Sequence, residues 1–428
     1  MEKVLATARP QSRQYKQIAP IGPPAVTASE LRQGHMFAGA LWAGALVLAA
    51  IAPPASARTA AYGANRSGAV SPARLQRWGA AVVRRTSVFR ISGTARLSGS
   101  AVLQSSGRRY VSAGGGAVTW ANGVELFMLT AATRCNHAYA PALWRFVQTL
   151  APYWRTAHGV GGYDVVSGHG PVDRYYDDNE WLVMGFMAAY RATGNAQYLR
   201  LAARTFRFVA SGDSSQLGGG IFWHEEAKTS KNTCSNGPAI VGALELYRAT
   251  HQKKYLNAAR RLYHWVNRHL QDRHDGLYFD NINLRHDVNK MQWSYNTGIM
   301  IQADVLFYKI TRRRKYLARA RRLARAAEKR WIDPVNHAMR GPGRFAVILI
   351  DALGSLYRVD HSPRQRIVLS RALRCLHQQD RNRLGYYPGV WNRPARVAKR
   401  VHLIDQSAVG AAYFSVAYDF RRVAAMRR

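Results

Sequence analysis

Two adjacent carboxylates are the residues of this chain best placed to do chemistry. Asp177 and Asp178 lie in an aromatic-flanked string, 173–181, that leads directly into an apolar run. Buried charges are costly unless they are paired or hydrogen-bonded, so this pair is a poor choice for a core. Two close carboxylates push each other's pKa values apart, which suits acid/base chemistry. Taken alone, the pair would equally suit the first turn of a helix, where acidic residues are stabilising.

The elements that must position this pair come from an internal repeat. The string Tyr-Arg-Ala-Thr at 190–193 recurs at 247–250, and looser copies lie at 308–311 and 357–360. Successive copies are 57, 61 and 49 residues apart. After each of the first three copies come a short turn and a Tyr-Leu pair, so each copy is expected to end one helix shortly before the next begins. The repeat therefore predicts helical hairpins.

The two helices of each hairpin differ in composition. The first is mostly apolar or small, and a helix that is apolar all round is buried. The second carries basic residues on one face. We expect inner helices near 119–133, 177–193, 236–250, 294–310, 345–359 and 404–420. We expect outer helices near 137–155, 195–210, 252–269, 312–330 and 362–379.

These helices predict an all-α fold, an (α/α)6 barrel of six helical hairpins. Only eleven helices are accounted for, and we expect 71–85, which opens with a Ser-Pro helix-start signal, to supply the twelfth. No alternation of strands and helices is visible, which excludes a parallel sheet. We divide the chain into an N-terminal tail, 1–57, a linker-like region with this one helix, 58–117, and a catalytic domain, 118–428.

Polar and aromatic strings precede the inner helices, all at the same phase of the repeat. If the inner helices run parallel around a ring, these strings converge at one end and line a cleft. Aromatic faces and amide or carboxylate groups suit a sugar, which has apolar faces and a rim of hydroxyls. Helix capping and turn formation could explain each string separately. The candidate substrate-binding residues are Trp223, Asn236, Asp280, Trp293, Tyr295 and Asn296. Trp181 could be a subsite wall or core.

The formal net charge of +38 is extreme and invites a nucleic-acid interpretation. The basic residues are spread along the chain, however, and no zinc-finger or RNP-type string is present, so we expect no specific nucleic-acid partner. Residues 312, 315, 319 and 322 are basic and recur at helical spacing, which fits a solvated helix face. An anionic envelope polymer or lipid surface is the partner that such a charge would suit.

The cysteines provide no disulfide framework. Cys135, Cys234 and Cys375 are odd in number and far apart, with no Cys-x-x-Cys motif. We expect no metal and no cofactor.

An uncharged run of 17 residues, 36–52, precedes two prolines and the small residues Ala-Ser-Ala at 55–57. This pattern is typical of the apolar core and cleavage site of a signal peptide. The run begins late and is only just long enough to span a bilayer, so a wrongly chosen start codon and a retained membrane anchor are alternatives. We expect export to a secreted, periplasmic or cell-envelope location.

Four of the strings resemble those of a known family. Residues 173–181, 218–223, 235–238 and 293–298 are similar to characteristic strings of glycoside hydrolase family 76, whose members are endo-acting α-1,6-mannanases with an (α/α)6 barrel. The most specific of them is Tyr-Tyr-Asp-Asp-Asn-Glu-Trp at 175–181. The resemblance extends from about Trp120 to the C-terminus. The N-terminal 115 residues match nothing in the family, and a neutral mannan does not account for the positive charge.

The resemblance implies a retaining hydrolase of α-linked mannan-type polysaccharide, with Asp177 as the nucleophile and Asp178 as the general acid/base. Retention needs two carboxyls about 5–5.5 Å apart, which neighbours at a loop-to-helix junction can reach.

We expect a monomer. A transglycosylase would share this site, and a non-catalytic envelope glycan-binding protein is an alternative from another class. A sugar epimerase would need cleft histidines, for which only His169 and His224 are candidates. The exact glycan and linkage stay open.

Overall fold

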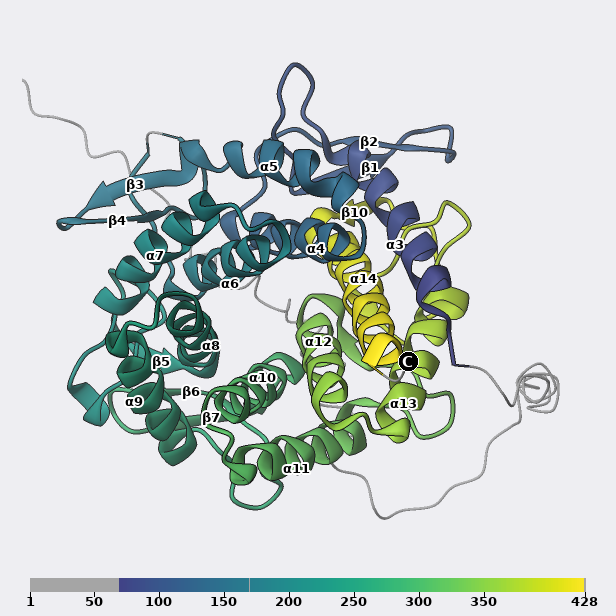
Figure 1. Cartoon of the computed structure of the whole chain (residues 1–428). Coiled ribbons are helices and arrows are strands. Elements are labelled where there is room, and N and C mark those ends of the chain that lie inside the picture. The colour runs from purple at the N-terminus through teal and green to yellow at the C-terminus, as the bar shows by residue number, and fades with distance from the viewer. Residues whose placement is uncertain (1–68, 169, 427–428) are drawn as a thin grey trace, which may run out of the picture. The chain divides into compact units, whose positions relative to one another are not determined.

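Helices dominate the architecture, and they are arranged as two concentric layers (Figure 1). The computed structural model describes residues 69–168 and 170–426, and this part of the chain contains twelve α-helices. The inner ring consists of α4 (Thr119–Cys135), α6 (Tyr176–Thr193), α8 (Thr233–Thr250), α10 (Ser294–Thr311), α12 (Gly343–Asp360) and α14 (Leu403–Met426). The outer layer consists of α3 (Pro72–Thr86), α5 (Ala140–Gln148), α7 (Ala196–Ser211), α9 (Lys253–His269), α11 (Arg314–Trp331) and α13 (Pro363–Cys375). The predicted (α/α)6 barrel is confirmed.

The repeat marks the ends of four inner helices. Each repeat tyrosine accepts a backbone hydrogen bond from the residue four positions on, and that residue adopts a left-handed conformation that stops the helix. These C-cap residues are Gly194, His251, Arg312 and His361, with φ of 74°, 55°, 57° and 52°. The repeated string is therefore a helix-termination signal that sets the length of the inner ring.

Helix α3 supplies the twelfth helix. The side chain of Ser71 accepts a hydrogen bond from the backbone N–H of Arg74, and Pro72 occupies the first helical position. The helix packs closely on α14, since a Cβ added to Gly79 would lie 2.7 Å from the ring of Phe414. A segment far from α14 in sequence thus closes the ring.

Residues 87–117 are structured and not a linker. Strand β1 (Ser100–Leu103) pairs in antiparallel register with both β2 (Tyr110–Ser112) and β10 (Arg400–His402), the strand that leads into α14. Residues 69–117 belong to the same compact unit as the barrel. The linker-like description of 58–117 is therefore wrong for this part. Its strands are too short to show the alternation of polar and apolar residues that identifies a strand in a sequence. Its Gly and Ser residues form the turns between the strands.

The predictions of a tail and of a signal-like run concern the N-terminal part of the chain. The tail 1–57, with its signal-like or anchor run 36–52, lies outside the described residues. Within the described residues, no helix combines the length and the apolar character needed to cross a membrane.

Short antiparallel strands precede the inner helices and carry the loops at their N-terminal ends. Besides the sheet of β1, β2 and β10, there are three such groups in the described residues. They are β3 (Trp154–Ala157) with β4 (Val160–Tyr163), β5 (Ser230–Asn232) with β6 (Phe279–Asn283) and β7 (Val288–Gln292), and β8 (Gly341–Pro342) with β9 (Val390–Trp391). Every pairing between named strands is antiparallel, as the absence of a strand–helix alternation predicts.

Helix α8 begins at Thr233, earlier than the sequence pattern indicates, with Pro238 inside it. Proline has no backbone N–H, so it cannot bond to the carbonyl four residues before it. That carbonyl belongs to Cys234, and the hydroxyl of Tyr295 on α10 donates to it at 3.3 Å. The proline therefore frees an acceptor that joins two neighbouring inner helices.

The contact between α10 and α12 leaves no room for a side chain at Gly298. A Cβ there would lie 2.8 Å from both the Cα and the backbone nitrogen of Leu349. Because the obstacle is backbone, we expect Gly298→Ala to lower the free energy of unfolding by about 1–3 kcal/mol, measured by urea denaturation. Gly170→Ala is the control, since nothing lies within 4 Å of that position. Equal stability of the two variants would contradict the close approach.

Candidate active site

The aspartate pair lies at the N-terminal end of inner helix α6. Asp177 and Asp178 are its second and third residues, and both are half-buried. The backbone N–H of Asp178 donates to Oδ1 of Asp177 at 3.1 Å. The N-terminus of a helix carries partial positive charge, which favours an ionised carboxylate there. The fold thus offers Asp177 a backbone donor and a favourable dipole.

Trp223 provides the second hydrogen bond to Asp177. Its indole Nε1–H donates to Oδ2 of Asp177 at 3.0 Å. The tryptophan is brought there by antiparallel pairing of 174–176 with 223–225, in which the N–H of Tyr176 donates to the carbonyl of Trp223 at 3.0 Å. The ring of Tyr175 lies against Trp223, with centroids 5.0 Å apart. Two loops distant in sequence therefore meet at the carboxylate.

A buried ion pair fixes this pairing. Arg174 is fully buried, and its guanidinium donates to both oxygens of Glu225, at 2.7 and 2.6 Å. It also donates to the carbonyls of Arg155, Ala157 and Val160, in and beside the β3–β4 hairpin. A bidentate pair of this kind holds direction as well as distance. Arg174 therefore ties the hairpin, the Trp223 loop and the start of α6 together.

Lys231 orders the glycine-rich loop that precedes Trp223. Its buried Nζ donates to the carbonyls of Ser214, Gln216 and Gly219 at 3.0, 2.6 and 2.6 Å. Burial lowers the pKa of Lys231 to about 8, and the nearby charge of Asp213 opposes that shift. The loop needs glycine, because φ is positive at 218–220, with values of 74°, 126° and 88°. The glycines thus serve loop geometry.

The two aspartates have different electrostatic environments. Burial raises the pKa of Asp177 to about 6, and the donors Trp223 and Cys234 oppose the rise. Burial also raises the pKa of Asp178, which the charges of Asp177 and then Asp173 raise further, well above the ordinary value. Asp177 is therefore the member of the pair that ionises first, and Asp178 retains the proton.

Cys234 is a site residue that the sequence analysis did not select. It is half-buried in the first turn of α8 and donates to Asp177. Burial, followed by the charge of Asp177, raises the pKa of its thiol well above the ordinary value, so the group stays protonated and remains a donor. Nothing in the sequence around Cys234 distinguished this thiol, because Asp177, to which it donates, belongs to a different repeat.

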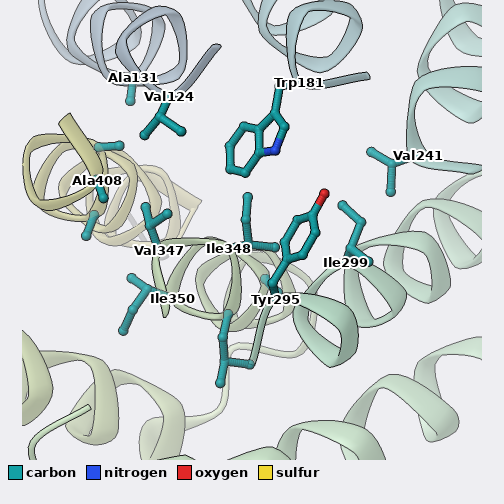
Figure 2. Close-up of a cluster of buried hydrophobic side chains, with 14 of the residues drawn as sticks. Val124, Ala131, Trp181, Val241, Tyr295, Ile299, Val347, Ile348, Ile350 and Ala408 are labelled. Atoms are coloured by element: carbon teal, nitrogen blue, oxygen red, sulfur yellow. The ribbon is translucent and has the colours of Figure 1, made fainter. Parts of the chain in front are cut away.

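An aromatic layer lies beneath the pair. Trp181 stacks on Tyr295, with ring centroids 5.8 Å apart and an interplanar angle of 10°, and Figure 2 shows the two side chains facing each other inside the ring of inner helices. Tyr295 also stacks on Phe345 at 6.1 Å. Trp181 and Tyr295 are 3% and 4% exposed, which places both in the floor of the site as core. Trp293 is half-buried at the start of α10, 5.2 Å from the ring of Phe345.

Asn236 has a different environment from the one expected of a substrate-binding residue. It is fully buried, and its amide bonds to both the N–H and the carbonyl of Ile221, at 2.7 and 2.9 Å. Asn179 on α6 makes the same pair of bonds to Tyr163, and Gln406 on α14 makes it to Tyr387. Asn236 therefore holds the Trp223 loop to its helix. The repeat spacing was a usable signal, since Asn179 and Asn236 are 57 residues apart, as are the first two repeat strings.

Asp280 and Asn296 lie together beside Cys234. Asp280 is half-buried on β6 and accepts a hydrogen bond from Asn281 at 3.0 Å. Burial raises its pKa, and hydrogen bonds from Asn281 and Asn296 oppose the rise. Asn296 is 1% exposed, and its Nδ2 also donates to the carbonyl of Phe279 at 3.2 Å. Of these two, Asp280 is the one with a side chain open to a ligand.

His224 is held by its own hydrogen bonds. Its Nδ1 accepts from the N–H of Ala227 at 2.7 Å, so its proton lies on Nε2, which donates to Asp173 at 2.7 Å. Because both ring nitrogens are already hydrogen-bonded within the protein, His224 is poorly placed to exchange a proton with a substrate. His169 lies outside the described residues.

Glu180 is a buried carboxyl below the pair. It is 1% exposed, and its carboxyl lies near the backbone N–H of Ala239 without a hydrogen bond of normal geometry. Burial and then the charge of Asp177 raise its pKa well above the ordinary value. Glu180 is therefore protonated when Asp177 is ionised.

Comparison with known proteins places this fold and site in a family. The family model described as Glycosyl hydrolase family 76 matches residues 145–350, the segment that contains the aspartate pair, Trp223, Cys234 and Asp280. The barrel and the aspartate pair are thus the features by which the chain resembles helical-barrel glycoside hydrolases. The match covers just under half of the chain, and over this segment the chain is similar to glycoside hydrolase family 76.

Two relatives by sequence are fungal. The mannan endo-1,6-alpha-mannosidase DCW1 of Candida glabrata is 32% identical over 152 residues, which cover 32% of this chain and 34% of that protein. The protein of the same name from Saccharomyces cerevisiae is 27% identical over 185 residues, 39% of this chain and 41% of that protein. The matched segments thus span less than half of these relatives.

Solved structures match over more of the chain. The family 76 α-mannanase of Bacteroides thetaiotaomicron superposes with a TM-score of 0.75 at 26% identity, covering 82% of this chain and 97% of that one. An α-1,6-mannanase of Salegentibacter sp. HEL1_6 has a TM-score of 0.66 at 21% identity, covering 80% and 99%. That structure is of an inactive variant, with two consecutive aspartates replaced by asparagine, in complex with α-1,6-mannotriose.

Glu180 generates a prediction about stability and pH. Its folded pKa is raised, so between the unfolded pKa and the folded pKa the unfolded chain binds fewer protons, and stability falls as pH rises through that interval. Glu180→Gln lacks this proton linkage. Compared with the wild type, the variant should therefore gain stability from pH 4.5 to pH 8, by about 1.4 kcal/mol for each unit by which the pKa is raised.

Urea denaturation at the two pH values measures this gain. Asp287→Asn, which removes an exposed carboxylate in the turn between β6 and β7, is the control. A stability difference between Glu180→Gln and wild type that is the same at both pH values would show that Glu180 is ionised in the folded protein.

Proposed function

We propose that the protein is a retaining glycoside hydrolase that cleaves α-linked mannan, with endo-α-1,6-mannanase activity. The observation that carries the proposal is the asymmetry of the aspartate pair. Asp177 receives hydrogen bonds from Trp223, Cys234 and the backbone, whereas burial and two neighbouring carboxylates keep the proton on Asp178. Glycoside hydrolysis requires one ionised and one protonated carboxyl, and adjacent residues suit the short separation of a retaining enzyme. The match to the family 76 model and the names of the relatives support the substrate class.

In the first step, a carboxylate oxygen of Asp177 attacks the anomeric carbon of a mannosyl residue. The bond from that carbon to the leaving oxygen breaks, and Asp178 transfers its proton to the departing hydroxyl. In the second step, Asp178 removes a proton from water, the water oxygen attacks the anomeric carbon, and the ester bond to Asp177 breaks. Donation from Trp223 and Cys234 fixes the orientation of Asp177 throughout.

The half-exposed members of the site are proposed to contact the sugar. Trp223 and Trp293 offer indole surface to the apolar faces of mannose, and Asp280 offers a carboxylate to its hydroxyls. The buried residues Asn236, Tyr295 and Asn296 are reassigned to support, because their polar groups are committed to the protein or shielded from a ligand.

The charged exterior supports an envelope location. Helix α11 exposes Arg314, Lys315, Arg321, Arg322 and Arg325, and the chain carries a net charge of +38. Such a surface is attracted to anionic polymers or lipid headgroups. We propose that the enzyme is exported and acts beside such a surface, consistent with the signal-like run at 36–52.

Asp177→Asn tests the nucleophile. An amide cannot form the ester intermediate, so we expect activity on α-1,6-mannan to fall by at least about 1,000-fold while the fold is kept. Product analysis on a panel of α-linked mannans, with circular dichroism for folding, is the measurement. Asp287→Asn, in the exposed turn between β6 and β7, is the matched control and should retain activity.

Two results of this experiment would count against the proposal. Near-normal turnover by folded Asp177→Asn would remove Asp177 from the nucleophile role. A wild-type enzyme that binds mannan without cleaving it would indicate a glycan-binding protein. Products longer than the substrate would instead identify transglycosylation, in which a sugar hydroxyl replaces water in the second step.

Asp178→Ala tests the acid/base and should affect substrates unequally. A good leaving group needs no proton, so an aryl mannoside with an acidic phenol should still form the glycosyl-enzyme, whereas mannan should not. The second step also loses its base, so the intermediate should accumulate and added azide should speed its release. Stopped-flow measurement of phenol release, with and without azide, checks this. Equal losses on both substrates, with no azide effect, would make Asp178 a binding or structural residue.

A further inference from the structure

The repeat leaves one feature that catalysis does not use, a basic residue directly after each repeat tyrosine. Arg191, Arg248, Lys309 and Arg358 occupy this position in the last turns of α6, α8, α10 and α12. Arg134 occupies the last turn of α4. These five residues are called the cationic ring below.

The cationic ring encloses a cavity. All five side chains line a space of about 430 Å³ between the inner helices, with contributions from Glu245, Asp351 and apolar side chains such as Phe127 and Met184. Arg191 lies fourteen residues after Asp177 on α6, which is about 21 Å along the helix axis. The cavity is therefore at the opposite end of the barrel from the aspartate pair. Its volume lies within the usual range for small-molecule sites.

The carboxylates around the cavity are already engaged. Glu245 accepts from Arg191 at 2.7 Å and from Arg248 at 3.1 Å. Asp419 on α14 pairs with Arg358 at 2.7 Å and lies 4.0 Å from Arg134. Lys309 makes no hydrogen bond or ion pair with any described residue. With every group ionised, the five cations face three carboxylates, Glu245, Asp351 and Asp419, which leaves an excess of up to two positive charges.

This excess is electrostatically costly to the protein alone. Burial lowers the pKa of Lys309 to about 7, and the charge of Arg358 adds to the effect. Burial also lowers the pKa of Arg191, against the attraction of Glu245. An anion bound between Lys309 and Arg191 would favour the charged form of both groups and raise their pKa values.

Helix dipoles do not account for the arrangement. A cation in the last turn of a helix is stabilising by about 0.3–1 kcal/mol, and it has that effect from the solvent side as well. Lys329 and Arg330 end α11 in that way and are exposed. Directing five such cations toward one cavity adds mutual repulsion, and Arg134, Lys309 and Arg358, which are half-buried, also lose solvation. A bound anion would offset both.

We propose that the cationic ring binds a small ligand that carries a phosphoryl group, either inorganic phosphate or a phosphorylated sugar. A phosphate monoester carries a charge of about −1.5 to −2 at neutral pH, which matches the excess. Arginine forks bind its oxygens in pairs, and lysine supplies a point charge. The apolar side chains Phe127, Met184 and Val241 offer surface to a sugar ring attached to it. The proposal stands independently of the catalytic assignment.

Isothermal titration calorimetry of the full chain with inorganic phosphate, a hexose 6-phosphate and the unphosphorylated hexose tests the proposal. We expect the two phosphates to bind and the hexose not to bind. Tighter binding of the hexose phosphate would identify the sugar as part of the ligand, and equal binding would identify phosphate alone. Lys309→Gln removes the cation of the ring that makes no hydrogen bond or ion pair with a described residue, and it should weaken binding roughly 10- to 100-fold. Lys315→Gln, an exposed charge on α11, is the control and should bind like the wild type.

A second readout needs no variant. Because Lys309 is partly deprotonated near neutral pH, an amine-reactive acylating reagent should label it, and saturating phosphate should protect it. Peptide mass spectrometry compares Lys309 with Lys315 in the same sample. The proposal is overturned if phosphate and hexose phosphate do not bind at millimolar concentration, if Lys309→Gln binds as tightly as Lys315→Gln, or if phosphate protects both lysines equally.

Discussion

The buried ion pair between Arg174 and Glu225 is the contact on which the active site depends. It joins Arg174, two residues before α6 begins, to Glu225, the residue after His224, and Arg174 also binds carbonyls of the β3–β4 hairpin. Removing one partner would leave an uncompensated buried charge, which typically costs about 3–5 kcal/mol. The hydrogen bond from Trp223 to Asp177 exists because this pair holds the two loops in register.

The parallel inner helices give the barrel two ends with opposite electrostatic character. The N-terminal end of α6 and strand β6 bring Asp177, Asp178 and Asp280 to one end, where the donors Trp223 and Cys234 oppose the rise in the pKa of Asp177. Helix C-termini bring the cationic ring together at the other. The aromatic stack of Trp181, Tyr295 and Phe345 lies between them. One repeated hairpin therefore builds a carboxylate site and a basic cavity at once.

Several side chains that the sequence analysis assigned to the substrate support the loops instead. The side-chain amide of Asn236 is hydrogen-bonded to the backbone of Ile221. The hydroxyl of Tyr295 donates to the carbonyl of Cys234, which Pro238 leaves free. Polar and aromatic residues before a helix are needed both to bind a sugar and to fasten a loop. Composition cannot distinguish the two uses, whereas burial can.

The sequence by itself determined the class of fold, the six hairpins, the twelfth helix and the family, because helical periodicity, the Tyr-Arg repeat and the string around Asp177 are local patterns. It also selected the aspartate pair. Only the tertiary structure decided which aspartate is ionised, placed Cys234 beside it and folded 87–117 onto the strand before α14. It also turned the four repeat cations and Arg134 toward one cavity. These outcomes depend on burial and on contacts between residues of different repeats, which no local pattern encodes.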